Sequence, residues 1–223
     1  MNIDSKQNYA VITGDFIGFS DLPAQVRQEM YFVLKACGSK LSEAFPGIMS
    51  CEVDVFRGDG WQVLLTNPIL SLRAALYFRA YIKAHSPDKN VDSRLSIGIG
   101  PIDYVPDNRV SAGDGPAFRM SGKMLDQMIS PKSGSMRFVM NGCDEAFLLD
   151  GIVRMAGSFA DFWTAKQSLA MTGALQGWTR KQIGGLWEDV ISIQSVGKYL
   201  HQANWYAVNH GLRVFEKAMA KLV

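Results

Sequence analysis

The chain has 223 residues, 48% of them hydrophobic, and a formal net charge of +2. This length suits one medium domain, or a larger domain with a small appendage, and there are enough apolar residues for a core. There is no run of eighteen apolar residues and no basic-then-apolar leader, so the sequence predicts a soluble, cytoplasmic protein without membrane contact. Cys37, Cys51 and Cys143 are too widely spaced for a disulfide framework or a zinc site, and we expect reduced packing residues.

The first 150 residues alternate between strand-like and helix-like patterns. Alternating, β-branched residues predict buried strands, and apolar residues at helical spacing predict amphipathic helices. The predicted elements are a strand at 8–14, a helix at 23–45, a hairpin at 50–57 and 61–66, a helix at 69–85, a strand at 94–102, a helix at 117–129 and a strand at 136–140. This order predicts an α+β, ferredoxin-like sandwich, with helices on one face of a mainly antiparallel sheet.

After about residue 150 the pattern is purely helical. We expect one helix over 159–175, two short helices that begin at the caps Thr179 and Ser192, and a long helix over 205–222. Short capped helices followed by a long one predict a small all-α helix-turn-helix module. The expected organisation is therefore one domain over 1–150 and a helical domain over 151–223.

Two aspartates lie where predicted strands end or turn. Asp15 ends the first strand, and Asp59 lies in the turn of the hairpin. If these strands pair, both carboxylates lie at one edge of the sheet, where they could hold Mg²⁺ or Mn²⁺ against phosphate oxygens. The turn 16–20 would then offer backbone N–H groups to an anion at a helix start. The alternative is that Asp15 caps a helix and Asp59 is an ordinary turn residue.

Three motifs resemble those of class III nucleotidyl cyclases. Asp15-Phe16-Ile17-Gly18-Phe19-Ser20 resembles their Asp-Ile-x-Gly-Phe-Thr/Ser motif, Gly58-Asp59 resembles their hairpin Gly-Asp, and 94–100 resembles their Arg-x-Gly-Ile-x-x-Gly strand. The resemblance covers about residues 8–140 and implies a cyclase-type palm domain. It implies that Asp15 and Asp59 are catalytic and bind metal, with Phe16 beside them. The implied nucleotide or phosphate contacts are Ile17, Gly18, Phe19, Ser20, Gly58 and Arg94.

The chain departs from the cyclase pattern at positions that matter for activity. Val53 and Val55 stand where the family has a base-selecting lysine, and Ala117 and Ser121 stand where it has asparagine and a transition-state arginine. Loss of a group that stabilises developing charge costs on the order of 10² or more in rate. Ordinary formation of cAMP or cGMP is therefore not expected, unless Arg119 or Lys123 acts as a substitute.

A second resemblance spans most of the chain. Thr13-Gly14-Asp15, Phe56-Arg57-Gly58-Asp59, the segment 113–123 and the helical tail resemble SatD-like bacterial proteins, which look like cyclase or palm relatives. This resemblance implies a role in the cleft for Arg57 and for the loop that carries Arg119 and Lys123. It names no substrate.

The tail is more basic than the rest of the chain. Residues 152–223 carry eight lysines and arginines against four acids. Segment 191–201 resembles a recognition helix, with Val196 and Leu200 packed inward. The residues expected to face DNA are Gln194, Ser195, Lys198 and His201. A helical dimerisation or lid module is the alternative.

The sequence thus predicts a Mg-dependent protein of the class III cyclase or palm type that binds a nucleoside triphosphate. If active, it would form a cyclic or linked nucleotide and release pyrophosphate. Because class III sites are generally completed by a second subunit, the resemblance also implies a homodimer. The alternatives are a catalytically inactive, nucleotide-sensing, DNA-binding transcriptional regulator and a purely structural dimerising protein.

Overall fold

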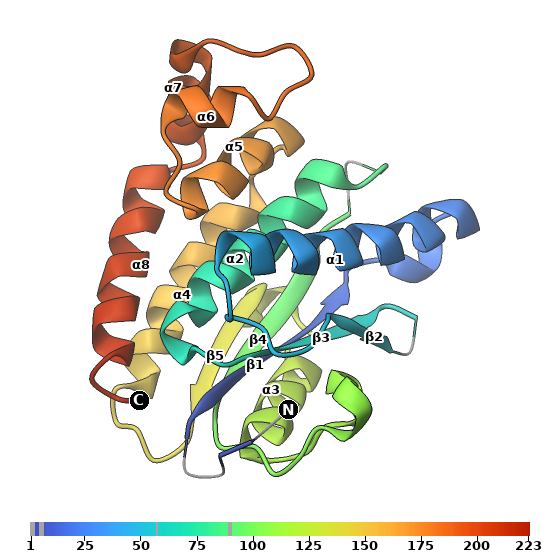
Figure 1. Cartoon of the computed structure of the whole chain (residues 1–223), viewed down its shortest axis with the longest axis vertical. Helices are drawn as coiled ribbons and strands as arrows, with labels where there is room; N and C mark the ends of the chain where they lie inside the picture. Colours follow the sequence, from blue (N-terminus) through green and yellow to red (C-terminus); the bar gives the residue numbers. More distant parts are fainter. Residues whose placement is uncertain (1–2, 5–6, 57, 89–90) are drawn as a thin grey trace.

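A computed structural model describes residues 3–4, 7–56, 58–88 and 91–223. Its centre is a five-stranded sheet in the order β2-β3-β1-β4-β5. The strands are β1 (Tyr9–Phe16), β2 (Asp54–Phe56), β3 (Gly60–Leu65), β4 (Ser93–Gly100) and β5 (Met136–Met140). β1 pairs antiparallel with β3 and β4, and β5 pairs parallel with β4 (Figure 1).

The first six elements form the predicted βαββαβ unit. Helix α1 (Ala24–Ala44) connects β1 to β2, and helix α2 (Ser71–His85) connects β3 to β4. The strand order β2-β3-β1-β4 is that of a ferredoxin-like sheet with β1 at its centre. This confirms the predicted fold class. β2 is shorter than expected, since residues 50–53 precede the strand.

Both faces of the sheet are covered, which corrects the prediction that all helices lie on one face. Ile12 of β1 packs in the core beneath α2, whereas its neighbour Val11 belongs to a second core cluster with Phe118 of helix α3 (Pro116–Gln127). Figure 1 shows α3 on the other side of the sheet from α1 and α2. The sheet surface below α3 carries small residues, and a Cβ on Gly98 would lie 2.5 Å from the carbonyl oxygen of Ala117.

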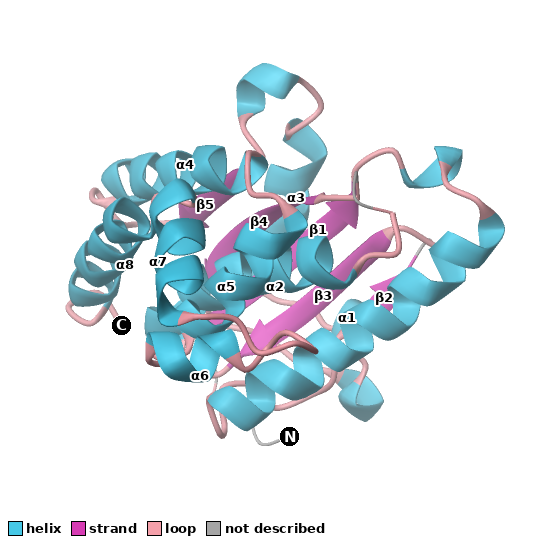
Figure 2. Cartoon of the chain, turned by 90° about the horizontal axis from the view of Figure 1, so that it is seen from above, coloured by secondary structure: helices cyan, strands magenta, loops and turns pink. Residues whose placement is uncertain are grey.

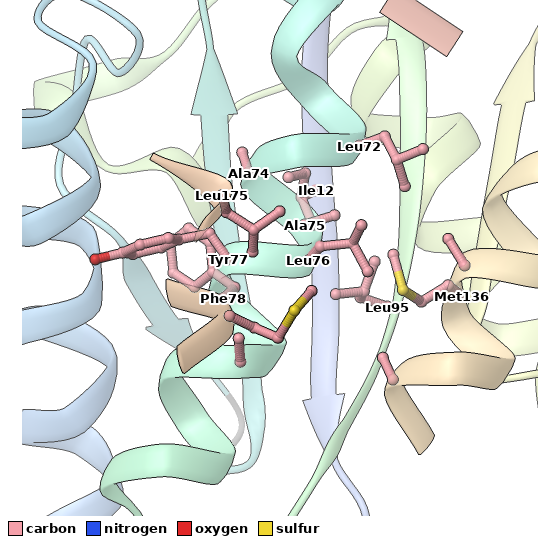
Figure 3. Close-up of a cluster of buried hydrophobic side chains, with 14 of the residues drawn as sticks. Ile12, Leu72, Ala74, Ala75, Leu76, Tyr77, Phe78, Leu95, Met136 and Leu175 are labelled. Atoms are coloured by element: carbon pink, nitrogen blue, oxygen red, sulfur yellow. The ribbon is translucent and has the colours of Figure 1, made fainter. Parts of the chain in front are cut away.

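Five further helices complete the molecule: α4 (Ala146–Asp161), α5 (Ala165–Leu175), α6 (Arg180–Gly184), α7 (Ile193–Gln202) and α8 (Trp205–Met219). α4 covers β5 on the same face as α2, where a Cβ on Gly157 would meet Met136. α5 lies behind α2, and Figure 3 shows Leu175 beside Ala74 and Tyr77 in the shared core. Figure 2 shows α6 and α7 at one end of this helical layer, next to α5.

The predicted single helix over 159–175 is wrong. The chain breaks between α4 and α5, where Phe162 ends one helix and Thr164 caps the next. Thr164 and Gln167 form a capping box, in which each side chain satisfies a backbone N–H of the other residue. The predicted caps Thr179 and Ser192 are confirmed.

The helical tail and the first 150 residues share one continuous core cluster. The expected boundary near residue 150 falls inside α4, so the division into two domains stays a prediction. Eight residues, 185–192, separate α6 from α7, and the helix-turn-helix module likewise stays a prediction. None of the helices in the described ranges combines the length and hydropathy needed to cross a bilayer. Cys37 and Cys51 are buried and unbridged.

Candidate functional site

Asp15 and Asp59 meet at one edge of the sheet. Asp15 is the penultimate residue of β1, and the antiparallel register places it opposite Gly60, the first residue of β3. The N–H of Phe16 donates to the carbonyl oxygen of Asp59 at 3.2 Å. The pairing of β1 with β3 therefore brings the two aspartates together.

Two cavities share these aspartates. The first, of about 630 Å³, is also lined by Gly18, Phe19 and Asp161, the last residue of α4. The second, of about 540 Å³, lies toward α3 and is also lined by Thr13, Gln62 and Arg119. These volumes suit small-molecule ligands, and we call the first the "palm cavity".

Arg94 of β4 binds the Asp15 carboxylate with two hydrogen bonds. Its Nε donates to Oδ1 at 2.8 Å, and its Nη2 donates to Oδ2 at 2.7 Å. A third N–H donates to the carbonyl oxygen of Met128. The hydrogen bonds to Asp15 raise the pKa of the Arg94 guanidinium above its ordinary value. Arg94 was expected on the phosphates, but its side chain is turned to Asp15.

The donor set at this edge suits a hard cation. Among the described residues there is no group of three or more His, Cys, Asp or Glu side chains that could hold a metal ion. Mg²⁺ commonly takes one or two carboxylates and keeps several waters, which the Asp15 and Asp59 pair can satisfy. Each Asp15 oxygen accepts one bond from Arg94 and retains a lone pair.

Phe16 was also expected among the metal ligands. Its side chain is buried and stacks on Phe19, so only its backbone carbonyl oxygen could bind a metal ion.

The turn after Asp15 differs from the predicted helix start. The N–H groups of Phe16 and Ile17 donate to the carbonyl oxygens of Asp59 and Asp92, so these two amides are used within the protein. Gly18 has φ of 66°, and a single 3₁₀ turn, Phe19–Asp21, follows. Since Leu22 is extended, α1 begins only at Ala24. Ile17, Gly18, Phe19 and Ser20 nevertheless line the palm cavity.

The other predicted nucleotide contacts are more scattered. Arg57 lies outside the described residues, and Gly58 takes φ of 87° in the hairpin turn. Arg119 lines the second cavity but forms ion pairs with Asp114 at 2.6 Å and Asp103 at 3.5 Å. Lys123 is exposed on α3 and lines neither of these cavities.

The two positions at which cyclases have asparagine and arginine are buried against the sheet. Ala117 and Ser121 are fully buried. The Ser121 hydroxyl shares a 2.8 Å hydrogen bond with Thr13, and the Ser96 hydroxyl donates to the Ser121 carbonyl at 2.5 Å. Neither residue lines either cavity.

Sequence reasoning missed a buried ion cluster beside the palm cavity, formed by Arg79, Lys83, Asp92 and Asp161. Arg79 is fully buried and donates to Asp92 and, at 2.9 Å, to Asp161, while Lys83 donates to Asp92 at 3.0 Å. Burial opposes the charged form of Arg79, but the two carboxylates outweigh it and raise its pKa. The signal in the sequence was an arginine and a lysine four residues apart within an apolar helix.

Ser93 was also missed. Its hydroxyl donates to the Asp15 carbonyl oxygen at 2.6 Å and accepts the indole N–H of Trp61 at 3.0 Å. Trp61 is fully buried and leaves no space for a side chain at Gly14, where a Cβ would lie 2.4 Å from the ring. Trp61 therefore holds the Ser93 hydroxyl, which in turn binds the backbone of Asp15.

The recognition-like helix α7 packs as its spacing predicts. Val196 and Leu200 are buried, as expected. Of the residues expected to face DNA, Gln194, Lys198 and His201 are exposed, whereas Ser195 is half-buried. The Ser195 N–H is engaged by the hydroxyl of the cap Ser192. DNA contact by this face stays a prediction.

Solved structures of nucleotidyl cyclases are similar to part of this chain. Two structures of a bacterial light-regulated adenylyl cyclase align over 59% of this chain at 16% and 17% identity, with a TM-score of 0.39. The chain spans only 43% and 42% of those proteins. The guanylyl cyclase Cya2 aligns over 57% of this chain and 73% of its own, at 13% identity and a TM-score of 0.38. No protein-family model and no curated protein sequence matches.

Proposed function

We propose that the chain binds a nucleoside triphosphate together with Mg²⁺ or Mn²⁺ at the palm cavity. The observation that carries this proposal is the convergence of Asp15 and Asp59 at adjacent strand ends, over a cavity of about 630 Å³. A pair of carboxylates that line a small-molecule cavity is an arrangement that can hold a metal–triphosphate complex.

Each residue at the edge has a definable role in this proposal. Asp15 and Asp59 would hold the cation, which, when bound, neutralises the phosphate oxygens. Arg94 lies next to Asp15 and would stay within reach of a phosphate that approaches the cation. Ser93 and Trp61 keep the Asp15 backbone fixed, so that the carboxylate is positioned before a ligand arrives.

The surroundings favour binding over turnover. Cyclisation or linkage would require a 3′-hydroxyl to lose its proton, form a bond to the α-phosphorus and break the α–β bridge, releasing pyrophosphate. The developing charge needs an additional cationic group. Ala117 and Ser121 are buried, and Arg119 is paired with Asp114, so turnover would require Arg119 to leave that carboxylate.

The second candidate is a nucleotide-sensing regulator that binds DNA through α7. The exposed polar face of α7, with Gln194, Lys198 and His201, favours it. A homodimer that completes the site is a further part of the proposal, and it rests on the cyclase resemblance alone. Light scattering with and without nucleotide measures the oligomeric state.

The first test is thermal unfolding of the protein with each of the four NTPs, with Mg²⁺, Mn²⁺ or EDTA. At least one NTP should raise the melting temperature in a metal-dependent manner. Asp59→Asn should abolish that increase, because it removes one of two anionic ligands, while the unfolding transition without ligand stays cooperative. Asp144→Asn, at an exposed aspartate away from both cavities, is the matched control and should respond as the unaltered protein does.

An unchanged response in Asp59→Asn would contradict the site assignment. Pyrophosphate release and mass analysis of the same mixtures separate the two candidates. A cyclic or linked product that Asp59→Asn does not form identifies an enzyme. Metal-dependent stabilisation without product favours the sensor, and DNA binding by Lys198→Ala and the unaltered protein is then compared with that nucleotide present.

A further inference from the structure

A separate cavity of about 520 Å³ lies in the helical tail, between the turn that joins α5 to α6 and the face of α8. Figure 1 shows α6 and α7 above α8, on the side of α2 away from the sheet. The cavity shares no residue with the two cavities at Asp15 and Asp59. We call it the helical cleft. Its side chains of interest are Trp178, Arg180, Trp205, Tyr206, Asn209 and Arg213.

The helical cleft carries an excess of positive charge. Three arginines and one glutamate line it. Arg73 is neutralised, since its Nε donates to Glu216 at 2.7 Å and its Nη1 donates to the Leu175 carbonyl at 2.8 Å. Within the described ranges, Arg180 and Arg213 have no ion-pair partner. Two guanidinium groups are therefore available to an anion.

Arg180 is held in place across the cleft. Its Nη2 donates to the hydroxyl of Tyr206 at 2.9 Å, which ties the start of α6 to α8. The guanidinium also lies against α7 at Gly197, where a Cβ would come within 3.2 Å of Nη1. Among the described residues, Tyr206 is the one hydrogen-bond partner of this guanidinium, so its other N–H donors can form a bidentate bond to an oxyanion.

Aromatic rings line the same cleft. Trp178 is 38% exposed and Tyr206 is 63% exposed, and Trp205 is half-buried beside them. Exposed rings in a positively charged groove provide surfaces on which a planar base stacks. Asn209 adds an amide that can both donate to and accept from a base edge.

We propose that the helical cleft is a second ligand site, which takes a nucleotide. The phosphate lies at Arg180 and Arg213, and the base lies against the tryptophans and Tyr206. The volume falls within the range of small-molecule sites. Among the described residues that line the cleft, Glu216 is the one carboxylate and it is engaged by Arg73, so this site needs no metal ion. That property distinguishes it from the palm cavity, whose proposed ligand requires a cation.

The test is calorimetric titration with AMP, adenosine and inorganic phosphate in buffer containing EDTA, which silences the palm cavity. AMP should bind more tightly than adenosine or phosphate alone, since it engages both parts of the cleft. Arg213→Gln should weaken AMP binding by about tenfold or more, because charge-assisted hydrogen bonds are lost. Lys217→Gln, one turn further along α8 and outside the cleft, removes the same charge and should leave the affinity within twofold.

A second variant covers the possibility that Arg213→Gln disturbs α8. Tyr206→Phe keeps the ring and removes only the hydroxyl that positions Arg180, so AMP affinity should fall while adenosine affinity stays unchanged. The proposal is overturned if AMP does not bind, if phosphate binds as tightly as AMP, or if Arg213→Gln and Lys217→Gln behave alike. Binding of a single-stranded oligonucleotide without binding of AMP would also overturn it, and would indicate a nucleic-acid groove.

Discussion

At the scale of single residues, the ion pair of Asp15 with Arg94 sets the charge in the wall of the palm cavity. Two hydrogen bonds of 2.8 and 2.7 Å join the guanidinium to both carboxylate oxygens. This pairing neutralises one of the two carboxylates on which a cation would depend. If a cation binds there as proposed, its affinity is set by the competition between the arginine and the metal for Asp15.

Arg94→Gln should strengthen binding of Mn²⁺ in the absence of nucleotide. Removal of a positive charge a few ångströms from the site frees the Asp15 carboxylate and removes repulsion, and we expect a gain of about tenfold. Electron paramagnetic resonance of free Mn²⁺ measures the affinity. Lys221→Gln is the charge control, and an equal or weaker affinity in Arg94→Gln would show that Arg94 does not compete with the metal.

The sequence allowed the two aspartates to be predicted because each belongs to a local pattern, a strand end or a Gly-Asp turn. The partner of Arg94 could not be predicted, since the register between β1 and β4 places Asp15 opposite it. Arg79 and its acceptor Asp161 are 82 residues apart, and only the docking of α4 brings them together. The local sequence pattern predicts where a charged residue lies, but its ion-pair partner is known only from the tertiary structure.

At the scale of elements, the close approach of α3 to the sheet depends on small side chains in β4. Gly98 faces the helix, and Thr13, Ser96 and Ser121 satisfy one another by hydrogen bonds in the buried contact. This layer of small and polar groups lets the helix backbone lie almost on the strands. It also sets the position of Arg119, which lies in the first turn of α3.

Gly98→Ala should lower the free energy of unfolding by about 1–3 kcal/mol, because a Cβ would lie 2.5 Å from the backbone of α3 and push the helix away. Urea denaturation measures the effect. Gly151→Ala is the matched control: it lies on the exposed face of α4 with nothing within 4 Å, and we expect a gain of about 0.5–1 kcal/mol. Equal stabilities for the two variants would contradict the tight approach.

Most helices and strands follow from periodicity and caps, and the errors have identifiable causes. The break between α4 and α5 was hidden, because the apolar pattern continues through Phe162 and Trp163. The position of α3 was missed, because Thr13 and Ser96 do not by themselves indicate that a helix covers them, and their hydrogen-bond partner Ser121 comes from a distant segment. A sequence pattern indicates which face of a strand is polar, but not whether another element supplies hydrogen-bond partners for its polar side chains.

At the scale of the whole molecule, the buried ion cluster joins the helical tail to the palm. Arg79 of α2 also donates to Ser135 and to the carbonyl oxygen of Gly157, so a single side chain contacts segments from both halves of the chain. Lys83 adds bonds to the carbonyl oxygens of Ala160 and Asp161 at the end of α4. The end of α4 is thereby fixed beside the palm cavity.

Arg79→Met should destabilise the protein by about 3–5 kcal/mol, because it leaves buried acceptors and a partly buried carboxylate without their donor. The free energy of unfolding in urea is the measurement. Lys40→Met breaks an exposed ion pair with Glu43 and should change stability by no more than about 0.5 kcal/mol. If the two variants lost similar amounts of unfolding free energy, the buried cluster would contribute no more to stability than an exposed ion pair.

The participation of Asp161 in the wall of the palm cavity has a consequence for chimeras. A cut near residue 150 would divide α4 and remove Asp161, which both lines the cavity and accepts a hydrogen bond from Arg79. An exchange of tails between related proteins would therefore have to retain α4 and join the new segment at 162–164, where the backbone already breaks. Among the described residues, none beyond Asp161 lines the palm cavity, so the new tail would have to match the apolar core shared with α2 but not the cavity itself.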